Sequence, residues 1–256
     1  MSKGFVIMAQ NTKSTDYVKC AEVLRDSIKR TMSNSNVTII TTDMLPYGDL
    51  APDSDWKLIN DWQVYEASPY DYTIKLEADM FIPRSIDYWW DVLKDRDVVV
   101  SSTIRDFKQN ISDVRIYRNF IDNNRLPNVY NAITYFKKSD LAKNFFETVK
   151  MIFTHWEEFK NIMHCNTNEL ATTDWVYAIA CHLHGEENTT MPVFTDMSMI
   201  HMKKYINDLI TEDWTSELIY EITPDCMRIN TFPQIYPFHY HVKEFASIIR
   251  KANELA

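Results

Sequence analysis

The order of strand-like and helix-like segments at the start of this chain limits its fold more than any other feature. Residues 3–9 form an apolar run typical of a buried strand, and residues 36–42 are rich in Val, Ile and Thr, which favour strands. Between them, apolar residues recur at helical spacing from Tyr17 to Ile28, with Thr15 as the expected N-cap. Two strands joined by such a helix pair in parallel. We therefore predict an α/β fold with a mostly parallel central sheet flanked by helices.

Another apolar run, residues 72–82, carries two carboxylates separated by one residue. In an extended chain the side chains at i and i+2 face the same way, so Glu77 and Asp79 can converge on one ligand while Ala78 points elsewhere. Ligands of open α/β sheets bind at the carboxyl ends of strands, where we expect this pair. Two hard oxygen ligands suit Mg²⁺ or Mn²⁺, which complete their coordination with water and substrate phosphates. A solvated acidic turn is the alternative interpretation.

The composition indicates one compact domain. With 256 residues, of which 45% are hydrophobic, the chain can bury one large core, and we expect a single domain over residues 1–256. The first residues do not resemble a signal peptide, and no apolar run approaches the roughly 20 residues that span a bilayer, so a cytoplasmic location is the expectation. The four cysteines lie far apart without C-x-x-C spacing, which argues against a disulfide framework and a zinc site.

Charge and glycine content exclude several ways of binding nucleic acids and nucleotides. A formal net charge of -9 disfavours broad wrapping of nucleic acid, although residues 105–125 hold several basic side chains among acidic ones. The chain contains only three glycines, so it has neither a G-x-G-x-x-G fingerprint nor a P-loop. A nucleotide would have to be bound by other means.

The rest of the chain continues to alternate between helix and strand patterns. The strongest helix pattern follows Ser139, an expected N-cap, and a further helix over residues 171–184 is expected to begin at Thr172 or Thr173 and to end at Gly185. We also expect helices over residues 55–67, 85–93 and 242–255, strands over residues 97–102, 128–136, 191–195 and 198–202, and an irregular surface excursion over residues 106–127.

Taken together, these motifs resemble GT-A glycosyltransferases, most closely the glycogenin-like and galactosyltransferase-like branch. The resemblance spans roughly residues 4–204 and is carried by the order of its motifs, at residues 75–79, 130–136, 173–175 and 200–204. It implies a GT-A-like domain with a nucleotide-binding half at about residues 1–104 and an acceptor-side half at about residues 105–256.

The same resemblance implies a metal site. In such enzymes Mn²⁺ or Mg²⁺ bridges the protein to the diphosphate of a nucleotide sugar, for which a UDP-sugar is the favoured donor. Asp79 matches the family's metal-binding Asp, and Glu77 stands where the family usually has Asp. His201 matches the late histidine ligand, although the glycine-containing pattern that surrounds it in the family is missing here. A buried strand histidine with a hydrogen-bond partner is the alternative for His201.

Further positions match the donor-binding residues of the family. Ala9, Asn11 and Tyr17 match the base-binding loop, Asp43 matches an acidic position that touches the base or ribose, and Lys204 lies where a phosphate contact is expected. Each has a plain alternative as a turn residue or as a residue of a helix start.

Two more positions match the reaction centre of the family. Asn131 and Asp174 match residues that face the donor sugar and the acceptor. Asp174 is the candidate general base if the reaction inverts the sugar, and a helix-start residue that favours the dipole otherwise. The pairs His182/His184 and His239/His241 raise the question of zinc, but no spacing matches a closed tetrahedral set, so polar or surface histidines are favoured. Residues 234–243 are then a C-terminal segment over the donor site.

The leading hypothesis is a metal-dependent glycosyltransferase that uses a nucleotide sugar. The acceptor is open between a glycan, a protein, a small molecule and a modified DNA base of the kind found in phages. A non-catalytic carbohydrate- or partner-binding module on a transferase scaffold is the alternative. A sugar-phosphate nucleotidyltransferase is a weaker one, because residues 8–13 lack the Gly-rich loop that such enzymes carry.

Overall fold

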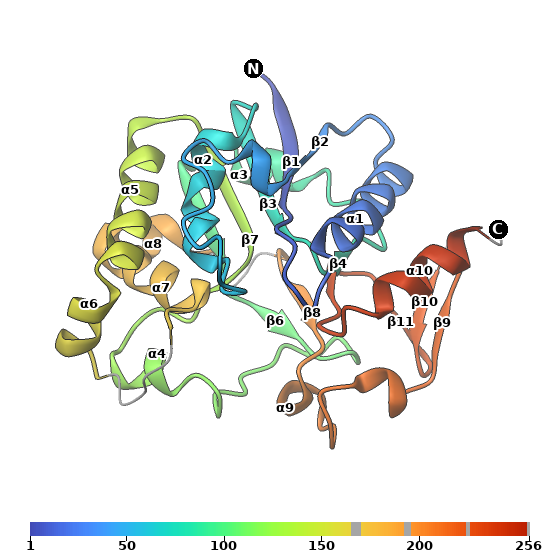
Figure 1. Cartoon of the computed structure of the whole chain (residues 1–256). Helices are drawn as coiled ribbons and strands as arrows, with labels where there is room; N and C mark the ends of the chain where they lie inside the picture. Colours follow the sequence, from blue (N-terminus) through green and yellow to red (C-terminus); the bar gives the residue numbers. More distant parts are fainter. Residues whose placement is uncertain (165–169, 192–195, 224–225, 255–256) are drawn as a thin grey trace.

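A computed structural model describes residues 1–164, 170–191, 196–223 and 226–254, and confirms the predicted α/β fold (Figure 1). Its main sheet has the strand order β2-β1-β3-β7-β5. β1 pairs in parallel with β2 and β3, whereas β7 runs antiparallel to β3 and β5. Four strands thus share one direction. Their bounds are β1 Lys3–Met8, β2 Val37–Ile40, β3 Tyr72–Glu77, β5 Val98–Ser101 and β7 Tyr130–Lys137.

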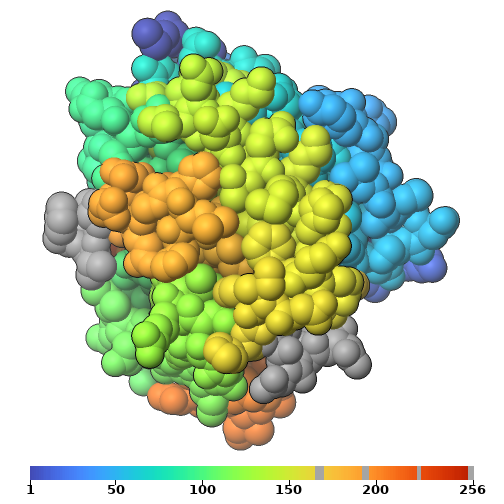
Figure 2. Space-filling model, turned by 90° about the vertical axis from the view of Figure 1, so that its left-hand side faces the viewer, coloured from blue at the N-terminus to red at the C-terminus, as the bar shows by residue number. Residues whose placement is uncertain are grey.

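Helices cover both faces of this sheet because its strands are apolar on both sides. Ile7 of β1 packs in one hydrophobic cluster with Leu24 of α1 (Tyr17–Thr31) and Ile249 of α10 (Phe245–Glu254). Its neighbour Val6 points the other way, into a cluster with Phe146 of α5. That second layer consists of α2 (Val64–Ala67), α5 (Asp140–Thr154), α6 (Trp156–Ile162), α7 (Thr173–His184) and α8 (Glu186–Thr189), of which Figure 2 shows α5 and α6 in yellow beside α7 and α8 in orange.

The strand order reverses between β1 and β3. From β1 the chain crosses through α1 to β2 on one side, and β3 lies on the other side of β1. Such a reversal opens a crevice at the carboxyl ends of the two central strands, where open α/β sheets bind ligands. The register places Met8 opposite Glu77, so the predicted carboxylate pair lies at this crevice.

A second sheet, with strand order β4-β12-β8-β6, closes the crevice from the C-terminal side. β12 pairs antiparallel with β4 and in parallel with β8. Just after β12, the Tyr240 N–H donates to the Asp79 carbonyl at 3.1 Å, which holds the last part of the chain against the carboxylate motif. Bounds are β4 Met80–Phe81, β6 Ile104–Arg105, β8 Met199–His201 and β12 Phe238–His239.

The remaining elements are short. They are the 3₁₀ helices η1 Thr42–Met44, η2 Leu58–Gln63 and η3 Trp214–Ser216, the helices α3 Trp89–Leu93, α4 Asn119–Asn123 and α9 Lys204–Asn207, and the small antiparallel sheet of β9 Tyr220–Ile222, β10 Met227–Ile229 and β11 Phe232–Pro233. No helix within the described ranges combines the length and the hydrophobicity needed to cross a membrane.

Several helix ends differ from the sequence-based expectation. Ser139 and Thr172 cap α5 and α7 as predicted, each accepting a backbone N–H three residues on. Thr15 was the wrong N-cap for α1. Its backbone closes a turn with Thr12, and the carboxylate of Asp16 instead accepts the Lys19 N–H at 3.1 Å.

Some element bounds also differ. The expected helix over residues 85–93 is only α3, the irregular segment over residues 106–127 contains α4, and the last helix begins at Phe245 rather than at residue 242. The expected strand over residues 191–195 falls largely outside the described residues, as does Cys165. Within them, Cys20, Cys181 and Cys226 are free thiols, as expected.

Candidate active site

A cavity of about 380 Å³ opens at the reversal point of the main sheet. Its floor and sides come from the ends of β1 and β3, and residues 55–58 form one wall. Thr173 at the start of α7 contributes a further edge. The opposite wall is the C-terminal segment, with His239, His241 and Lys243.

Two carboxylates and two cationic groups meet in this cavity. The His239 Nε2 lies 3.0 Å from Asp79 Oδ2 and 3.3 Å from Glu77 Oε2. The Lys243 ammonium also donates to Asp79 Oδ2. Because the Asp79 side chain is only 6% exposed, both of its partners act on a carboxylate that water barely reaches. In an enclosed site such charge-assisted contacts are stronger than they are in water.

The environment separates the proton affinities of these groups. Burial alone would raise the pKa of Asp79, but His239 and Lys243 together hold it well below the usual value. For Glu77 burial prevails, and its pKa is raised. Burial opposes protonation of His239, yet Asp79 and Glu77 raise the pKa of this ring. The lowered pKa of Asp79 favours its ionised form, and the raised pKa of His239 favours protonation of the ring that faces it.

His201 lies behind His239 rather than at the carboxylates. Its Nδ1 is 3.0 Å from the Nδ1 of His239, and the ring of His241 packs against both imidazoles. Burial, reinforced by the neighbouring rings, lowers the pKa of His201 well below its usual value and that of His241 to about 2. Both rings are therefore neutral near physiological pH.

A buried polar network supports the end of β3 from below. Lys75, which is 1% exposed, forms an ion pair of 2.8 Å with Asp61 and donates to the Asn131 carbonyl at 3.1 Å. The other oxygen of Asp61 accepts from the Asn131 amide at 2.9 Å and from the Tyr177 hydroxyl at 2.6 Å. The network thereby ties β3 to η2, β7 and α7.

Asn131 and Asp174 are joined to each other, and neither lines the cavity. Asp174 Oδ1 accepts the backbone N–H of Asn131 at 2.9 Å, and Oδ2 accepts from the guanidinium of Arg118 at 2.7 Å. The Asn131 side chain also has buried partners at both ends, since its amide nitrogen donates to Asp61 and its amide oxygen accepts the Thr134 hydroxyl at 2.8 Å. Arg118 itself is only 3% exposed, so Asp174 neutralises a buried cation.

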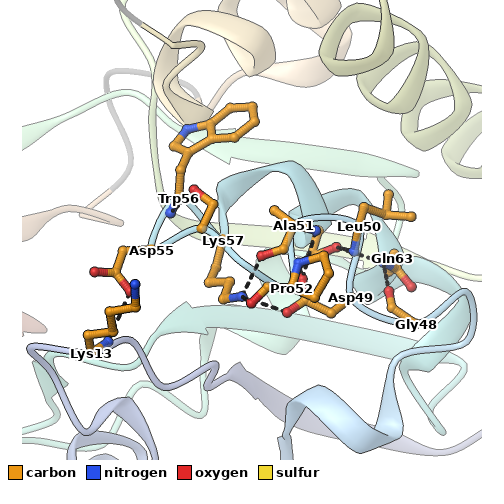
Figure 3. Close-up of polar contacts among 12 residues, drawn as sticks. Lys13, Gly48, Asp49, Leu50, Ala51, Pro52, Asp55, Trp56, Lys57 and Gln63 are labelled. Carbon is orange, nitrogen blue, oxygen red and sulfur yellow. Dashed lines mark hydrogen bonds and ion pairs between the residues drawn. The ribbon is translucent and has the colours of Figure 1, made fainter.

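The wall over residues 55–58 is held by the loop before it, shown in Figure 3. The Lys57 ammonium forms an ion pair with Asp49 at 2.6 Å and donates to the carbonyls of Ala51 and Pro52. Asp55 accepts the Lys13 N–H at 3.0 Å, which links this wall to the loop after β1. These contacts fix a polar rim beside the carboxylates.

The structure brings only some of the predicted donor-binding residues to the cavity. Tyr17 lines it together with Glu77 and Asp79. Ala9 lies just beyond β1, and its backbone N–H donates to the Ile40 carbonyl at 2.9 Å. The Asn11 side chain accepts the Val18 N–H at 3.0 Å.

Asp43 and Lys204 lie outside this cavity. Asp43 is exposed and accepts the Thr41 hydroxyl, which lowers its pKa. Lys204 starts α9 and lies 3.9 Å from Glu212.

His239, His241 and Lys243 were not singled out as site residues from the sequence. Their spacing of two residues resembles that of Glu77 and Asp79, although only His239 lies on a strand and His241 has a left-handed backbone with φ of 61°. The sequence alone suggested only a possible zinc role for the two histidines, and no spacing matched a closed zinc site. Pairing of β12 with β4 is what places them opposite the carboxylates.

The residues present fit a divalent ion. Glu77, Asp79 and His239 each offer a ligand atom, and these atoms lie within 4.8 Å of one another. Two carboxylate oxygens and one imidazole nitrogen suit Mn²⁺ or Mg²⁺ with a phosphate-bearing ligand. His201, His239 and His241 form a second group with the same spread.

Comparison with known proteins supports the fold. No protein-family model matches the chain, and no curated protein matches it in sequence. Among solved structures, the chain is similar to apo mouse xyloside xylosyltransferase 1, at a TM-score of 0.51 and 10% identity, over 93% of this chain and 97% of that one. It is similar to the galactosyltransferase LgtC bound to donor and acceptor sugar analogues, at a TM-score of 0.50 and 10% identity, over 97% and 94%.

A third match, the bifunctional glycosyltransferase WbbM, has a TM-score of 0.45 and 13% identity and covers 75% of this chain, which spans only 38% of the WbbM chain. At such identities a likeness concerns the fold alone. The xylosyltransferase and LgtC matches, which extend over nearly the full length of both partners, show that this chain has the fold of GT-A glycosyltransferases.

Proposed function

We propose that this protein is a metal-dependent glycosyltransferase that takes its sugar from a nucleotide-sugar donor, with a UDP-sugar as the favoured donor. The observation that carries the proposal is the meeting of Glu77, Asp79, His239 and Lys243 in the cavity at the sheet reversal point. The GT-A fold supports it. A glycan or a modified DNA base is the proposed acceptor.

In this proposal Glu77, Asp79 and His239 hold Mn²⁺ or Mg²⁺. The bound ion supplies positive charge to the diphosphate that leaves the sugar. Lys243 supplies a second positive charge. Its ammonium forms an ion pair with Asp79, and from this position it could also donate to phosphate oxygens of a bound diphosphate.

The donor and acceptor lie on opposite sides of this centre in our proposal. The nucleotide-binding half, about residues 1–104, supplies Tyr17 and the wall over residues 55–58, where aromatic and polar side chains can flank a base. The acceptor-side half, about residues 105–256, supplies the start of α7 and the C-terminal segment. The donor side and the acceptor side of the site are thus formed by residues far apart in the sequence.

We propose a positioning role for Asp174 and Asn131. Both oxygens of Asp174 already accept hydrogen bonds, from Arg118 and from the Asn131 backbone. A general base must lie within hydrogen-bond reach of the proton that it takes. These bonds hold the Asp174 carboxylate beside β7, and it does not line the cavity, so the geometry favours a mechanism without this base.

The test is ligand-dependent thermal stabilisation followed by donor turnover. UDP, GDP, CDP, ADP and their sugars are compared with and without Mn²⁺, because a ligand that binds the native state raises the apparent melting temperature. We expect a Mn²⁺-dependent shift with one diphosphate and release of that diphosphate from its sugar. Asp79→Asn should abolish both, while Asp91→Asn on the exposed side of α3 should abolish neither. Full turnover by a folded Asp79→Asn protein would refute the proposal.

A non-catalytic binding module is the second candidate. Lys243 and His239 both contact the Asp79 carboxylate, so its negative charge is balanced without a metal ion. A module of this kind would bind a nucleotide or sugar with no need for Mn²⁺ and would not release diphosphate from any donor.

A further inference from the structure

An ion pair lines the active-site cavity below the carboxylate motif. Its members, Lys75 and Asp61, are only 1% and 8% exposed, and both reach the cavity. The Lys75 ammonium lies 2.8 Å from Asp61 Oδ1. Because side chains alternate along a strand, Lys75 faces the same side of β3 as Glu77, and the Cα atoms of alternate residues are about 7 Å apart. The pair therefore lies one step deeper in the cavity than Glu77.

Stability alone is a poor reason for a charged pair at this position. Lys75 lies on a central strand, opposite Val6 of β1 on one side and Thr134 of β7 on the other. Its sequence neighbours Ile74 and Leu76 are fully buried. Apolar residues of similar volume often replace a buried ion pair without loss of stability. A few buried polar groups that line a cavity typically orient a ligand and select it.

The carboxylate of Asp61 keeps an acceptor position for a ligand. A carboxylate offers about four such positions. Among the described residues, Lys75 occupies one of them at Oδ1. Asn131 and Tyr177 occupy two more at Oδ2, at 2.9 and 2.6 Å. One position at Oδ1 remains, on a side chain that lines the cavity.

The ammonium of Lys75 likewise keeps a donor. It has three N–H groups. Within the described part of the chain, one of them is directed at Asp61 and another donates to the Asn131 carbonyl at 3.1 Å. A free donor and a free acceptor therefore lie side by side at the bottom of the cavity.

Such a pair matches two neighbouring hydroxyl groups of a sugar. A hydroxyl both donates and accepts, so one of them can donate to Asp61 while the next accepts from Lys75. The charges of the pair balance each other, and Glu77 and Asp79 add two more carboxylates to the same cavity. Since like charges brought together are costly, a neutral sugar fits this cavity better than a uronic acid.

We propose that Lys75 and Asp61 bind two neighbouring free hydroxyls of a neutral donor sugar, and so determine which sugars this protein accepts. With the diphosphate at Glu77 and Asp79, the sugar attached to it reaches the pair one step along β3. The assignment rests on the proposed function, because a nucleotide sugar must bind in this cavity.

The first test uses the unaltered, full-length protein in calorimetric titrations with Mn²⁺. The probes are UDP, or the diphosphate that the nucleotide panel selects instead, and its glucose and galactose derivatives. The sugar that binds more tightly is then compared with analogues that each lack one ring hydroxyl. Removal of either of two neighbouring hydroxyls should weaken binding by about 10–100-fold, because a hydrogen bond to a charged group is lost and that group is left unpaired.

Two results of these titrations would overturn the proposal. One is equal affinity across the whole series of analogues, or a loss only at hydroxyls that are not neighbours. The other is tighter binding of the glucuronic acid derivative than of the glucose derivative.

Variants then connect the hydroxyls to the pair. Asp61→Asn should lower the affinity for the intact nucleotide sugar by about 10–100-fold and leave the affinity for the diphosphate unchanged. The analogue that lacks the hydroxyl bound by Asp61 should bind this variant and the unaltered protein equally. Asp55→Asn makes the same change on an exposed wall of the cavity and should leave the ratio of the two affinities unchanged. Equal loss of both ligands in Asp61→Asn would show a structural role only.

The outcomes also separate this proposal from the proposed function. If no nucleoside diphosphate binds, with or without Mn²⁺, both fail. If a diphosphate binds and neither the sugar hydroxyls nor Asp61→Asn affect binding of its sugar derivative, the proposed function stands and the role of Lys75 and Asp61 alone is refuted.

Discussion

Lys75→Met should destabilise the protein strongly because it leaves a buried carboxylate without its cation. Lys75 is 1% exposed and Asp61 is 8% exposed. Breaking a buried pair costs about 3–5 kcal/mol. Asp61 keeps its hydrogen bonds from Asn131 and Tyr177 and reaches the cavity, so we expect the lower end, about 3 kcal/mol. In a domain of this size that loss lowers the melting temperature by about 6–12 °C, which thermal and denaturant unfolding can measure.

Two further variants isolate the cause. Lys3→Met makes the same change at the start of β1, where Lys3 and Asp87 are 3.7 Å apart and more than half exposed, so its cost should stay below about 1 kcal/mol. Adding Asp61→Asn to Lys75→Met removes the stranded charge and should restore part of the stability. If Lys75→Met costs no more than Lys3→Met, the reasoning about this network is refuted.

Three other results are expected. Gly4→Ala should cost about 1–3 kcal/mol in denaturant unfolding, because the new Cβ would lie 2.4 Å from ring atoms of Tyr70; an unchanged midpoint would contradict this. Burial raises the pKa of Cys181 to about 12, so iodoacetamide near neutral pH should spare this thiol in the native protein and modify it after unfolding, as peptide mass spectrometry can establish. Chelation should leave the protein folded by circular dichroism, since Lys243 already neutralises Asp79; unfolding on chelation would show that this pairing is insufficient.

The strand and helix patterns predict the main sheet well because they record burial on both faces. Along β1, the side chains of Val6 and Ile7 alternate between the two hydrophobic clusters on opposite faces of the sheet. The apolar face of α5 packs in the cluster that contains Val6. The antiparallel direction of β7 depends instead on pairing with β3 and β5, which no local pattern reports. Strands as short as β4 and β12 have too few residues for a period to be detected.

The sequence predicts only part of the candidate site, because local patterns do not report which strands pair. Glu77 ends β3 and Asp79 lies in the turn that follows it, so the two carboxylates are close in sequence and a local pattern could indicate them. His201 and His239 are 38 residues apart, and only the pairing of β8 with β12 brings them together. The bond between Arg118 and Asp174 joins residues 56 apart, so the engagement of that carboxylate could not be foreseen.

Assembly of the site depends on β12, the last strand in the sequence. Glu77 ends β3 and Asp79 follows it, whereas the groups that balance their charge lie about 160 residues later, at His239 and Lys243. Closing a long loop costs little more than closing a short one, because the entropy grows only with the logarithm of length. An ionised Asp79 buried without partners would be far more costly. Pairing of β12 with β4 therefore brings the neutralising groups to Asp79, and the first half of the chain alone would lack them.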